Sequence, residues 1–125
     1  MHREILIVDD EEIVVFIHDY MIKKSGIASE TLKFCNGLEA LTYLNKQCPL
    51  LHNYIIFLDI NMPVMNGWQL LTALEEADYK NRLEVILVSS SIDPYDLKKS
   101  KEFPMVKTFL PKPLTVESCL ELSIF

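Results

Sequence analysis

The stretch IIFLDINMPVMNG, residues 55–67, decides the fold of this chain. Four apolar residues, 55–58, lead directly to Asp59, and turn-forming residues follow at Pro63 and at Asn66-Gly67. A short apolar run of this kind is typical of a strand that is buried on both faces, as in a parallel sheet. Asp59 would then lie at the carboxyl end of that strand, where open α/β sheets place their binding sites. An unpaired carboxylate is costly to bury, so Asp59 either caps the following loop or belongs to a polar site.

Length, composition and charge restrict the class of protein. A chain of 125 residues can form one domain with its own core, and a hydrophobic content of 50% argues against disorder. The 18 acidic and 12 basic residues give a net charge of −6, which argues against a nucleic-acid-binding surface. No apolar run approaches the roughly 20 residues of a membrane span. The N-terminus lacks the features of a signal peptide.

The three cysteines, Cys35, Cys48 and Cys119, form no Cys-x-x-Cys pair. We therefore expect reduced, mostly buried thiols in a cytoplasmic protein rather than a disulfide or zinc framework.

Apolar runs alternate with helical segments along the whole chain. Strands are predicted over residues 5–8, 31–34, 54–58, 85–88 and 106–110. Helices are predicted over residues 11–24, from 38 to before Pro49, over 68–77 and 93–100, and from 115 onward, with caps at Asp93 and Thr115. This alternation predicts a doubly wound α/β fold with a parallel sheet and helices on both faces. The first, third and fourth strands are the most apolar and should be central, whereas the fifth runs into Pro111, which fits an edge strand or a strand end.

Polar residues stand where four of the predicted strands end: Asp9 and Asp10, Asp59, Ser89, and Lys112. Because the carboxyl ends of parallel strands share one edge of a sheet, we expect these side chains to meet in a shallow cleft. Three neighbouring carboxylates repel one another, and a divalent cation relieves that repulsion. Oxygen ligands in a shallow site favour Mg²⁺.

A carboxylate whose charge a metal neutralises can attack phosphorus and form an aspartyl phosphate. In that chemistry Lys112 would supply positive charge to the phosphoryl oxygens and Ser89 a hydroxyl donor. Each residue alone has an ordinary structural explanation: an acidic helix start, a turn serine, a surface lysine between two prolines. Their coincidence at one edge of the sheet favours the functional interpretation.

The chain resembles the receiver domain of response regulators, the phosphoacceptor module of two-component signalling. The Asp-x-x-Met-Pro-x-Met-Asn-Gly run at 59–67, the acidic pair Asp9-Asp10 and the Lys112-Pro113 pair carry the resemblance, which extends over essentially all of residues 1–125. It implies a flavodoxin-like (βα)5 three-layer sandwich with strand order 2-1-3-4-5. We expect a single receiver domain without an output domain.

The resemblance also implies roles for individual residues. Asp59 would accept a phosphoryl group from a sensor histidine kinase or a histidine phosphotransfer protein. Asp10 would bind Mg²⁺ directly, Asp9 directly or through water, and Asn61 through its backbone carbonyl. The Lys112-Pro113 bond would be cis, an uncommon isomer.

Ser89 and Phe109 stand where the family has its two switch residues. Phosphorylation would draw Ser89 inward, and Phe109 would rotate into the vacated space. The surface made by the fourth helix, the fifth strand and the fifth helix would then change and bind an unidentified protein target. Such a domain is a signalling protein and not an enzyme, apart from slow reactions of its own phosphoryl group.

Residues 13–17 of the first predicted helix are all apolar, so they cannot all face the core. We expect Val15 and Phe16 to be exposed and to contact the kinase or phosphotransfer partner. Alternatively, an irregular helix buries them or a dimer contact covers them.

Two departures and two alternatives remain open. Residues 101–106 replace a small, glycine-containing turn of the family, and Pro111 directly before Lys112 is uncommon there.

A haloacid-dehalogenase-type phosphohydrolase also forms an aspartyl phosphate, but its nucleophile follows the first strand in an Asp-x-Asp motif, whereas residue 61 here is Asn. A receiver-like module that works without phosphorylation is the second alternative.

Overall fold

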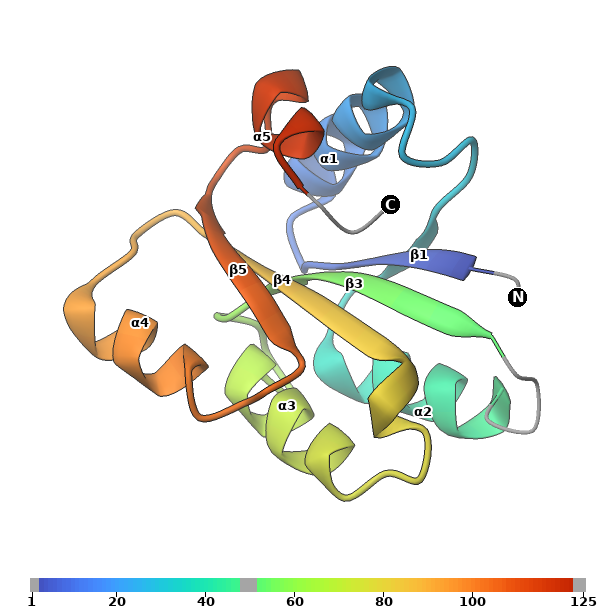
Figure 1. Ribbon diagram of the computed structural model, residues 1–125, viewed down its shortest axis with the longest axis vertical. Helices are drawn as coiled ribbons and strands as arrows, with labels where there is room; N and C mark the ends of the chain where they lie inside the picture. The colour runs from blue at the N-terminus through green and yellow to red at the C-terminus, as the bar shows by residue number, and fades with distance from the viewer. Residues whose placement is uncertain (1–2, 48–51, 123–125) are drawn as a thin grey trace.

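A five-stranded parallel sheet with the order β2-β1-β3-β4-β5 forms the centre of the molecule in the computed structural model (Figure 1). The structure describes residues 3–47 and 52–122. Its elements are β1 (Arg3–Val8), α1 (Glu12–Ser25), β2 (Leu32–Phe34), α2 (Gly37–Gln47), β3 (Asn53–Asp59), α3 (Gly67–Glu75), η1 (Lys80–Arg82), β4 (Leu83–Ser89), α4 (Pro94–Ser100), β5 (Val106–Pro111) and α5 (Val116–Leu120). The predicted α/β fold and strand order are confirmed, with β1, β3 and β4 in the centre and β5 at an edge.

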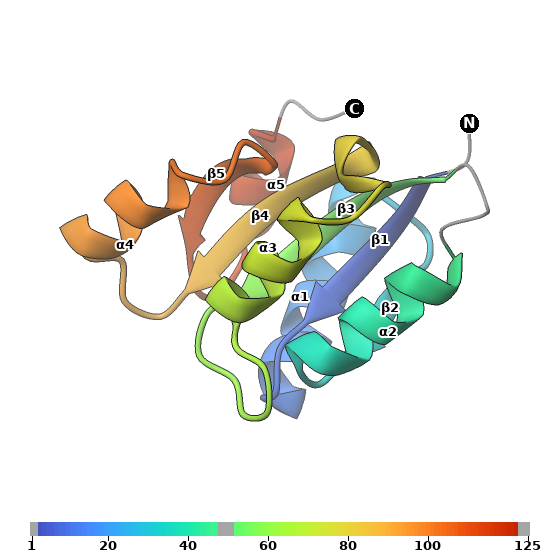
Figure 2. The ribbon, with the colours of Figure 1, turned by 90° about the horizontal axis from the view of Figure 1, so that it is seen from below.

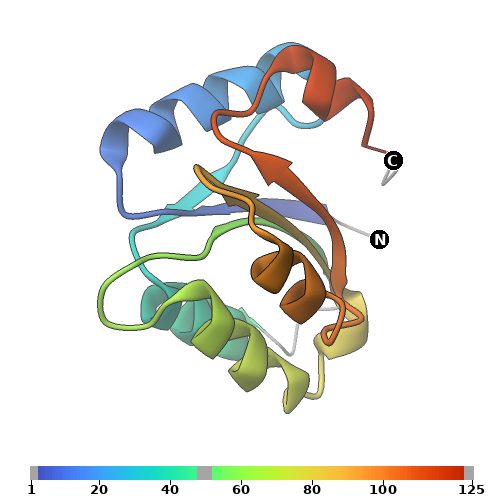
Figure 3. The ribbon, with the colours of Figure 1, turned by 90° about the vertical axis from the view of Figure 1, so that its left-hand side faces the viewer.

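The sheet separates two helical layers (Figure 3). Helices α1 and α5 cover one face, and α2 and α3 cover the other. β3 shows how the sequence produces this arrangement, because six of its seven residues are buried. Tyr54, Ile56 and Leu58 pack in the core beneath α2 and α3, whereas Ile55 and Phe57 pack beneath α1 and α5. The unbroken apolar run is therefore the signature of a strand with a core on each side.

Local signals account for most of the helix boundaries. Asp93 accepts a hydrogen bond from the backbone N–H of Asp96 and caps α4, and Thr115 caps α5 by accepting one from Ser118. Gly26 ends α1 in the left-handed region with φ 86°. The single-turn helix η1 was not predicted, because three polar residues carry no apolar period.

The segment before β5 contains the bulky residues that the sequence suggested would alter this turn. Phe103 and Met105 are 9% and 5% exposed, and both belong to the core beneath α2 and α3. The carbonyl of Met105 accepts the backbone N–H of Val85 at 2.8 Å. These bulky residues thus anchor the approach to β5 in the core.

The cysteine prediction is half correct among the described residues. Cys119 is buried and free as expected, whereas Cys35 is free but exposed. Cys48 and Pro49 lie outside the described residues. None of the helices in the described part of the chain has the length and apolar character needed to cross a membrane.

Candidate functional site

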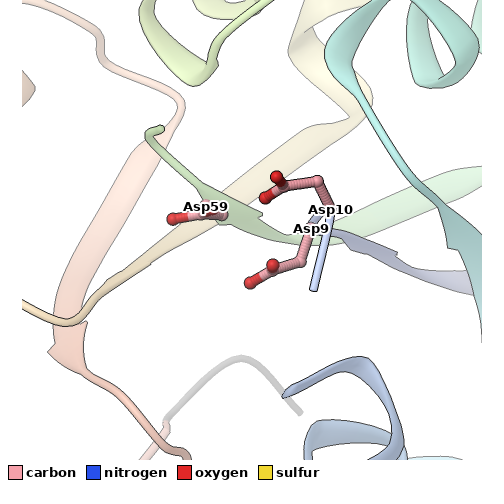
Figure 4. Close-up of side chains that lie close together, drawn as sticks. All are labelled: Asp9, Asp10 and Asp59. Carbon is pink, nitrogen blue, oxygen red and sulfur yellow. The ribbon is translucent and has the colours of Figure 1, made fainter. Parts of the chain in front are cut away.

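Three carboxylates gather where β1 and β3 end (Figure 4). One oxygen from each of Asp9, Asp10 and Asp59 lies within 4.8 Å of the other two. Asp9 and Asp59 are only 3% and 5% exposed, and Asp10 is exposed. The backbone N–H of Asp9 donates to the carbonyl of Phe34 at 3.0 Å, which anchors the β1 end to β2. The parallel sheet thus brings together acids that are 50 positions apart, as predicted.

Lys112 bridges the two buried carboxylates. Its Nζ lies 2.8 Å from Asp9 Oδ2 and 3.2 Å from Asp59 Oδ1, and its side chain is 8% exposed. The backbone N–H of Lys112 donates to the carbonyl of Ser89 at 2.8 Å, which fixes the end of β5 to the end of β4. The Lys112-Pro113 peptide bond is cis, so that prediction is confirmed. Pro111 does not displace the lysine from the site.

Burial dominates the electrostatics of this cluster. It raises the pKa of Asp59 to about 6, and the neighbouring charge of Asp9 acts in the same direction. The charge of Lys112, its hydrogen bond and the backbone N–H of Asn61 all lower the pKa of Asp59, but they do not compensate. Burial alone would lower the pKa of Lys112, whereas its contacts with Asp9 and Asp59 raise that pKa, and the net direction is upward. The contacts with the two carboxylates therefore favour the charged form of Lys112.

The donor set fits a hard divalent cation. Three carboxylates meet one ammonium, so the cluster carries excess negative charge, and the charge of Asp9 adds to burial in raising the pKa of Asp59. Carboxylate oxygens with an open, solvent-facing side at Asp10 are the ligands that Mg²⁺ selects. Asn61 lies next to the cluster, since its backbone N–H is hydrogen-bonded to the Asp59 carboxylate. The contact predicted for its carbonyl stays a prediction.

The NMPVMNG segment shapes the loop beyond Asp59. The backbone N–H of Gly67 donates to the carbonyl of Ile60 at 2.8 Å. A Cβ at residue 67 would lie 2.6 Å from the carbonyl oxygen of Asp59 and 2.9 Å from Ile60 Cα, so only glycine fits there. Val64 has φ 68°, and the N–H of Met65 donates across it to Pro63. The loop is therefore a tight turn folded back on the end of β3.

The β3–α3 loop is also fixed to α2. The backbone N–H of Gly37 donates to the carbonyl of Met65 at 2.9 Å. A Cβ at residue 37 would lie 2.8 Å from that same carbonyl oxygen. Both glycines thus permit close backbone contacts that hold the loop beside Asp59.

Ser89 and Phe109 occupy positions compatible with the predicted switch. Ser89 ends β4, is 3% exposed, and both donates to the carbonyl of Ser91 at 2.9 Å and accepts from its N–H at 3.2 Å. Phe109 pairs with Leu87 across the β4–β5 ladder and is half-buried against the core beneath α3. Residues two apart on a strand share a face, so Ser89 and Phe109 are diagonal neighbours. The Ser89 hydroxyl is bonded to its own loop and not to the carboxylates.

The exposure predicted for α1 is correct for Phe16 and wrong for Val15. Phe16 is 71% exposed, whereas Val15 is half-buried against the core beneath α1 and α5. Val15, His18 and Ile22 follow the helical period and form the inner face of α1. His18 obscured this face in the sequence because it is a polar residue at a core position. The exposed apolar residue that accompanies Phe16 is Ile13, which is 76% exposed, and not Val15.

Sequence reasoning missed Glu11 as a member of the site. Its carboxylate lies 3.3 Å from Lys112 Nζ, and its backbone N–H donates to Asp9 Oδ1 at 2.9 Å. The signal was its place in the acidic run 9–12, which does not reveal which acids point inward. The Glu11 side chain is 62% exposed, so its effect on Lys112 is weaker than that of Asp9.

Comparisons with known proteins agree with this geometry. The family model described as the response regulator receiver domain matches residues 5–122. The chain is 28% identical over 117 residues to sporulation initiation phosphotransferase F of Bacillus subtilis, covering 94% of this chain and 87% of that protein. It is 27% identical over 121 residues to the polar-differentiation response regulator DivK of Brucella anthropi, covering 97% and 93%.

Solved structures with the same fold include two bacterial regulators. A two-component response regulator from Cytophaga hutchinsonii superposes with a TM-score of 0.85 at 32% identity, covering 94% of this chain and 90% of that one. A response regulator receiver protein from Dyadobacter fermentans superposes with a TM-score of 0.83 at 25% identity, covering 95% and 93%.

Proposed function

The chain belongs to the response regulator receiver domain family, and we propose that it accepts a phosphoryl group on Asp59 from a histidine kinase or a histidine phosphotransfer protein. The observation that carries this proposal is the convergence of Asp9, Asp10 and Lys112 on Asp59 at the carboxyl edge of the sheet. The Bacillus subtilis relative is named a phosphotransferase, which supports a place for this chain in a phosphorelay.

The chemistry follows from the residues. An Asp59 carboxylate oxygen forms a bond to phosphorus while the phosphorus–nitrogen bond of a phosphohistidine breaks, and the electron pair of that bond stays on the imidazole. Lys112, already 3.2 Å from Asp59 Oδ1, would hold the charge of the phosphoryl oxygens. Mg²⁺ held by Asp9, Asp10, Asp59 and the carbonyl of Asn61 would supply further positive charge at the same oxygens. This is self-modification, so we expect slow turnover of its own phosphoryl group and no enzymatic activity on other substrates.

Intact-protein mass spectrometry after incubation with acetyl phosphate tests the proposal. We expect the wild type to gain one phosphoryl group only when Mg²⁺ is present, and the Asp59→Ala variant to gain none. Asp93→Ala is a matched control, because Asp93 is an exposed acid that caps α4 and is not one of the three clustered carboxylates. Absence of an adduct on the wild type, together with absence of beryllofluoride binding, would contradict the proposal.

We propose that Ser89 and Phe109 convert phosphorylation into a change of surface. The Ser89 hydroxyl would leave Ser91, with which it now exchanges two hydrogen bonds, and bind the phosphoryl group. Phe109 would rotate toward the vacated space. We expect Ser89→Ala to remain phosphorylatable while the amide shifts of α4 and β5 on activation become smaller. Equal shifts in the variant and the wild type would contradict this role.

The phosphodonor would dock on an α1 stripe, which we define as Ile13, Phe16 and Tyr20. These side chains are 76%, 71% and 52% exposed, and their i, i+3, i+7 spacing suits an antiparallel or parallel helix of the donor. Helix α1 begins at Glu12, two residues after Asp10, so the first turn of the stripe is close in the chain to the acid cluster. Val15 is not part of the stripe, because it packs inward.

A comparison of two donors tests the docking surface. We expect Phe16→Glu to slow transfer from the phosphorylated donor protein by at least about tenfold, because it places a charge in an apolar contact. Transfer from acetyl phosphate should be unchanged. Leu38→Glu on α2 is the matched control, since Leu38 is an exposed apolar residue outside the stripe. Equal transfer rates for Phe16→Glu and wild type with the protein donor would rule the stripe out.

We propose that the domain acts in the cytoplasm and that its downstream partner is a protein, without nucleic-acid or membrane binding through this domain. The haloacid-dehalogenase alternative gains no support, because the candidate nucleophile ends β3 and residue 61 has no carboxylate. The acid cluster and Lys112 are complete, which favours a phosphorylated receiver over a module that works without phosphorylation.

A further inference from the structure

Helix α4 is held in place by unusually little apolar burial. It is seven residues long, and its one buried residue is Ser100. Tyr95 and Leu97 are 69% and 42% exposed, so its large apolar side chains point toward solvent. Figures 1 and 3 show α4 at the β5 edge of the sheet, on the same side as α3, and Figure 2 shows the same edge from below. Hydrophobic packing therefore does not determine its position.

Aromatic contacts of Lys99 connect α4 to α3. The Lys99 ammonium lies 5.0 Å from the centre of the Trp68 ring and 5.8 Å from that of Tyr95. Both distances are within the range of cation–π attraction, which is strongest with Trp. Trp68 also stacks on Phe103, with ring centres 6.1 Å apart and an interplanar angle of 23°. Phe103 is buried at the entry to β5, so the stack is rooted in the core.

Trp68 is connected to the acid cluster through its neighbour in the chain, Gly67. Trp68 follows Gly67, whose N–H binds the carbonyl of Ile60 and whose Cα packs against the carbonyl of Asp59. At the other end of α4, Ser89 is bonded to Ser91 in the β4–α4 connection. Each end of the helix is thus attached through a residue that neighbours the Asp59 site.

We propose that Lys99 and Trp68 form a cation–π latch that fixes the C-terminal half of α4 against α3 and transmits the state of the Asp59 site to that helix. The latch positions α4 in the protein without a phosphoryl group. Its role in transmission rests on the proposed phosphoacceptor function. Lys99 is a positioning residue here, since it touches neither the carboxylates nor a phosphoryl group.

Hydrogen exchange on the unmodified protein tests the latch itself. Lys99→Met keeps the aliphatic length and removes the charge, and we expect it to speed exchange of the α4 amides by about threefold to fivefold. Lys98→Met is the matched control, because Lys98 is an exposed neighbour with no cation–π partner in the described part of the chain. Equal α4 exchange in the two variants would overturn the latch.

Trp68 is the only tryptophan of the sequence, so its emission reports on the latch directly. With beryllofluoride and Mg²⁺ we expect the emission of wild type and Lys98→Met to change. In Lys99→Met that change should fall by at least about half, as should the amide shifts of α4. The amide shift of Gly67 should persist in all three proteins.

The outcomes separate the two proposals. An undiminished α4 response in Lys99→Met would overturn transmission through the latch. Absence of a Gly67 response in every protein would contradict the phosphoacceptor function, and the exchange experiment would still decide the latch.

Discussion

The ionised carboxylate of Asp59 is unfavourable in the folded protein, because it is buried beside Asp9. Burial and the charge of Asp9 raise its pKa to about 6 although Lys112 lies 3.2 Å away. A raised pKa means that the folded state disfavours the carboxylate relative to the unfolded chain. That penalty is present above pH 6 and disappears below the unfolded value of 3.8. The three converging carboxylates favour a divalent cation at the site.

We expect Asp59→Asn to stabilise the metal-free protein at pH 7.5 by about 2 kcal/mol. The substitution removes the buried negative charge of residue 59, while Lys112 remains ion-paired with Asp9. Urea denaturation in the presence of a chelator measures this. Asp10→Asn, at an exposed acid, should change the free energy of unfolding by less than about 0.5 kcal/mol. At pH 4 the advantage of Asp59→Asn should largely vanish. Equal free energies of unfolding for wild type and Asp59→Asn at pH 7.5 would show that the charge of Lys112 fully compensates the cost of burying the Asp59 carboxylate.

His18 should make the stability fall in mild acid. Burial, aided by the charge of Lys112, lowers the pKa of His18 to about 4 from 6.5. The unfolded chain therefore binds the proton more tightly, and stability decreases as pH falls from 6.5 to 4 by up to about 3 kcal/mol. Asp59 acts in the opposite direction over part of this range, so the Asp59→Asn background isolates the effect. In that background we expect His18→Leu to flatten the dependence of unfolding free energy on pH, and an unchanged slope would disprove the assignment.

At the scale of elements, the β3–α3 loop shows how close backbone packing positions Asp59. The Gly67 Cα packs against the carbonyl of Asp59, and Gly37 brings α2 against the same loop. Val64 adopts φ 68°, which is strained for a β-branched residue. The surrounding hydrogen bonds from Gly67 and Met65 hold this conformation in place. The position of Asp59 is therefore set by backbone packing in the loop as much as by the strand.

We expect Gly67→Ala to destabilise the protein by about 2–3 kcal/mol, because its Cβ meets backbone atoms that cannot move independently. It should also weaken beryllofluoride binding, because Asp59 must shift. Gly26→Ala is the matched control: its Cβ has open space but its φ is 86°, so it should lose about 1 kcal/mol and leave binding intact. Similar binding losses in both variants would point to global destabilisation in place of a local shift.

At the scale of the whole molecule, the sheet gathers acidic charge that the rest of the fold does not neutralise. The chain carries a net charge of −6, and three of its acids converge at one edge. A cation that binds only the folded state stabilises it by mass action. Folding and metal binding should therefore be coupled.

We expect 10 mM Mg²⁺ to raise the melting temperature by roughly 3–6 °C, corresponding to about 1.4 kcal/mol for a dissociation constant of about 1 mM. NaCl of equal ionic strength is the control for screening. Asp9→Asn should abolish the difference between the two salts, whereas Asp93→Asn should preserve it. A shift of equal size with both salts would exclude a specific site.

Much of the architecture could be predicted because its signals are local. The apolar run before Asp59 identified a strand with two buried faces, and Asp93, Thr115 and Gly26 marked helix ends by capping chemistry. The alternation of strands and helices then required a parallel sheet. A parallel sheet places all carboxyl strand ends on one edge, so the meeting of Asp9, Asp59 and Lys112 followed from topology without any knowledge of side-chain contacts.

Tertiary structure alone decided how those residues interact. Whether Val15 or Ile13 faces solvent depended on which side of α1 meets the sheet, a rotation that five consecutive apolar residues leave undetermined. The pKa of Asp59 depended on burial and on distances to Asp9 and Lys112, which separation along the chain does not encode. The contact between Lys99 and Trp68 joins two helices that share no pattern in the sequence. Periodicity reports on one element at a time, whereas these properties arise only when elements pack against one another.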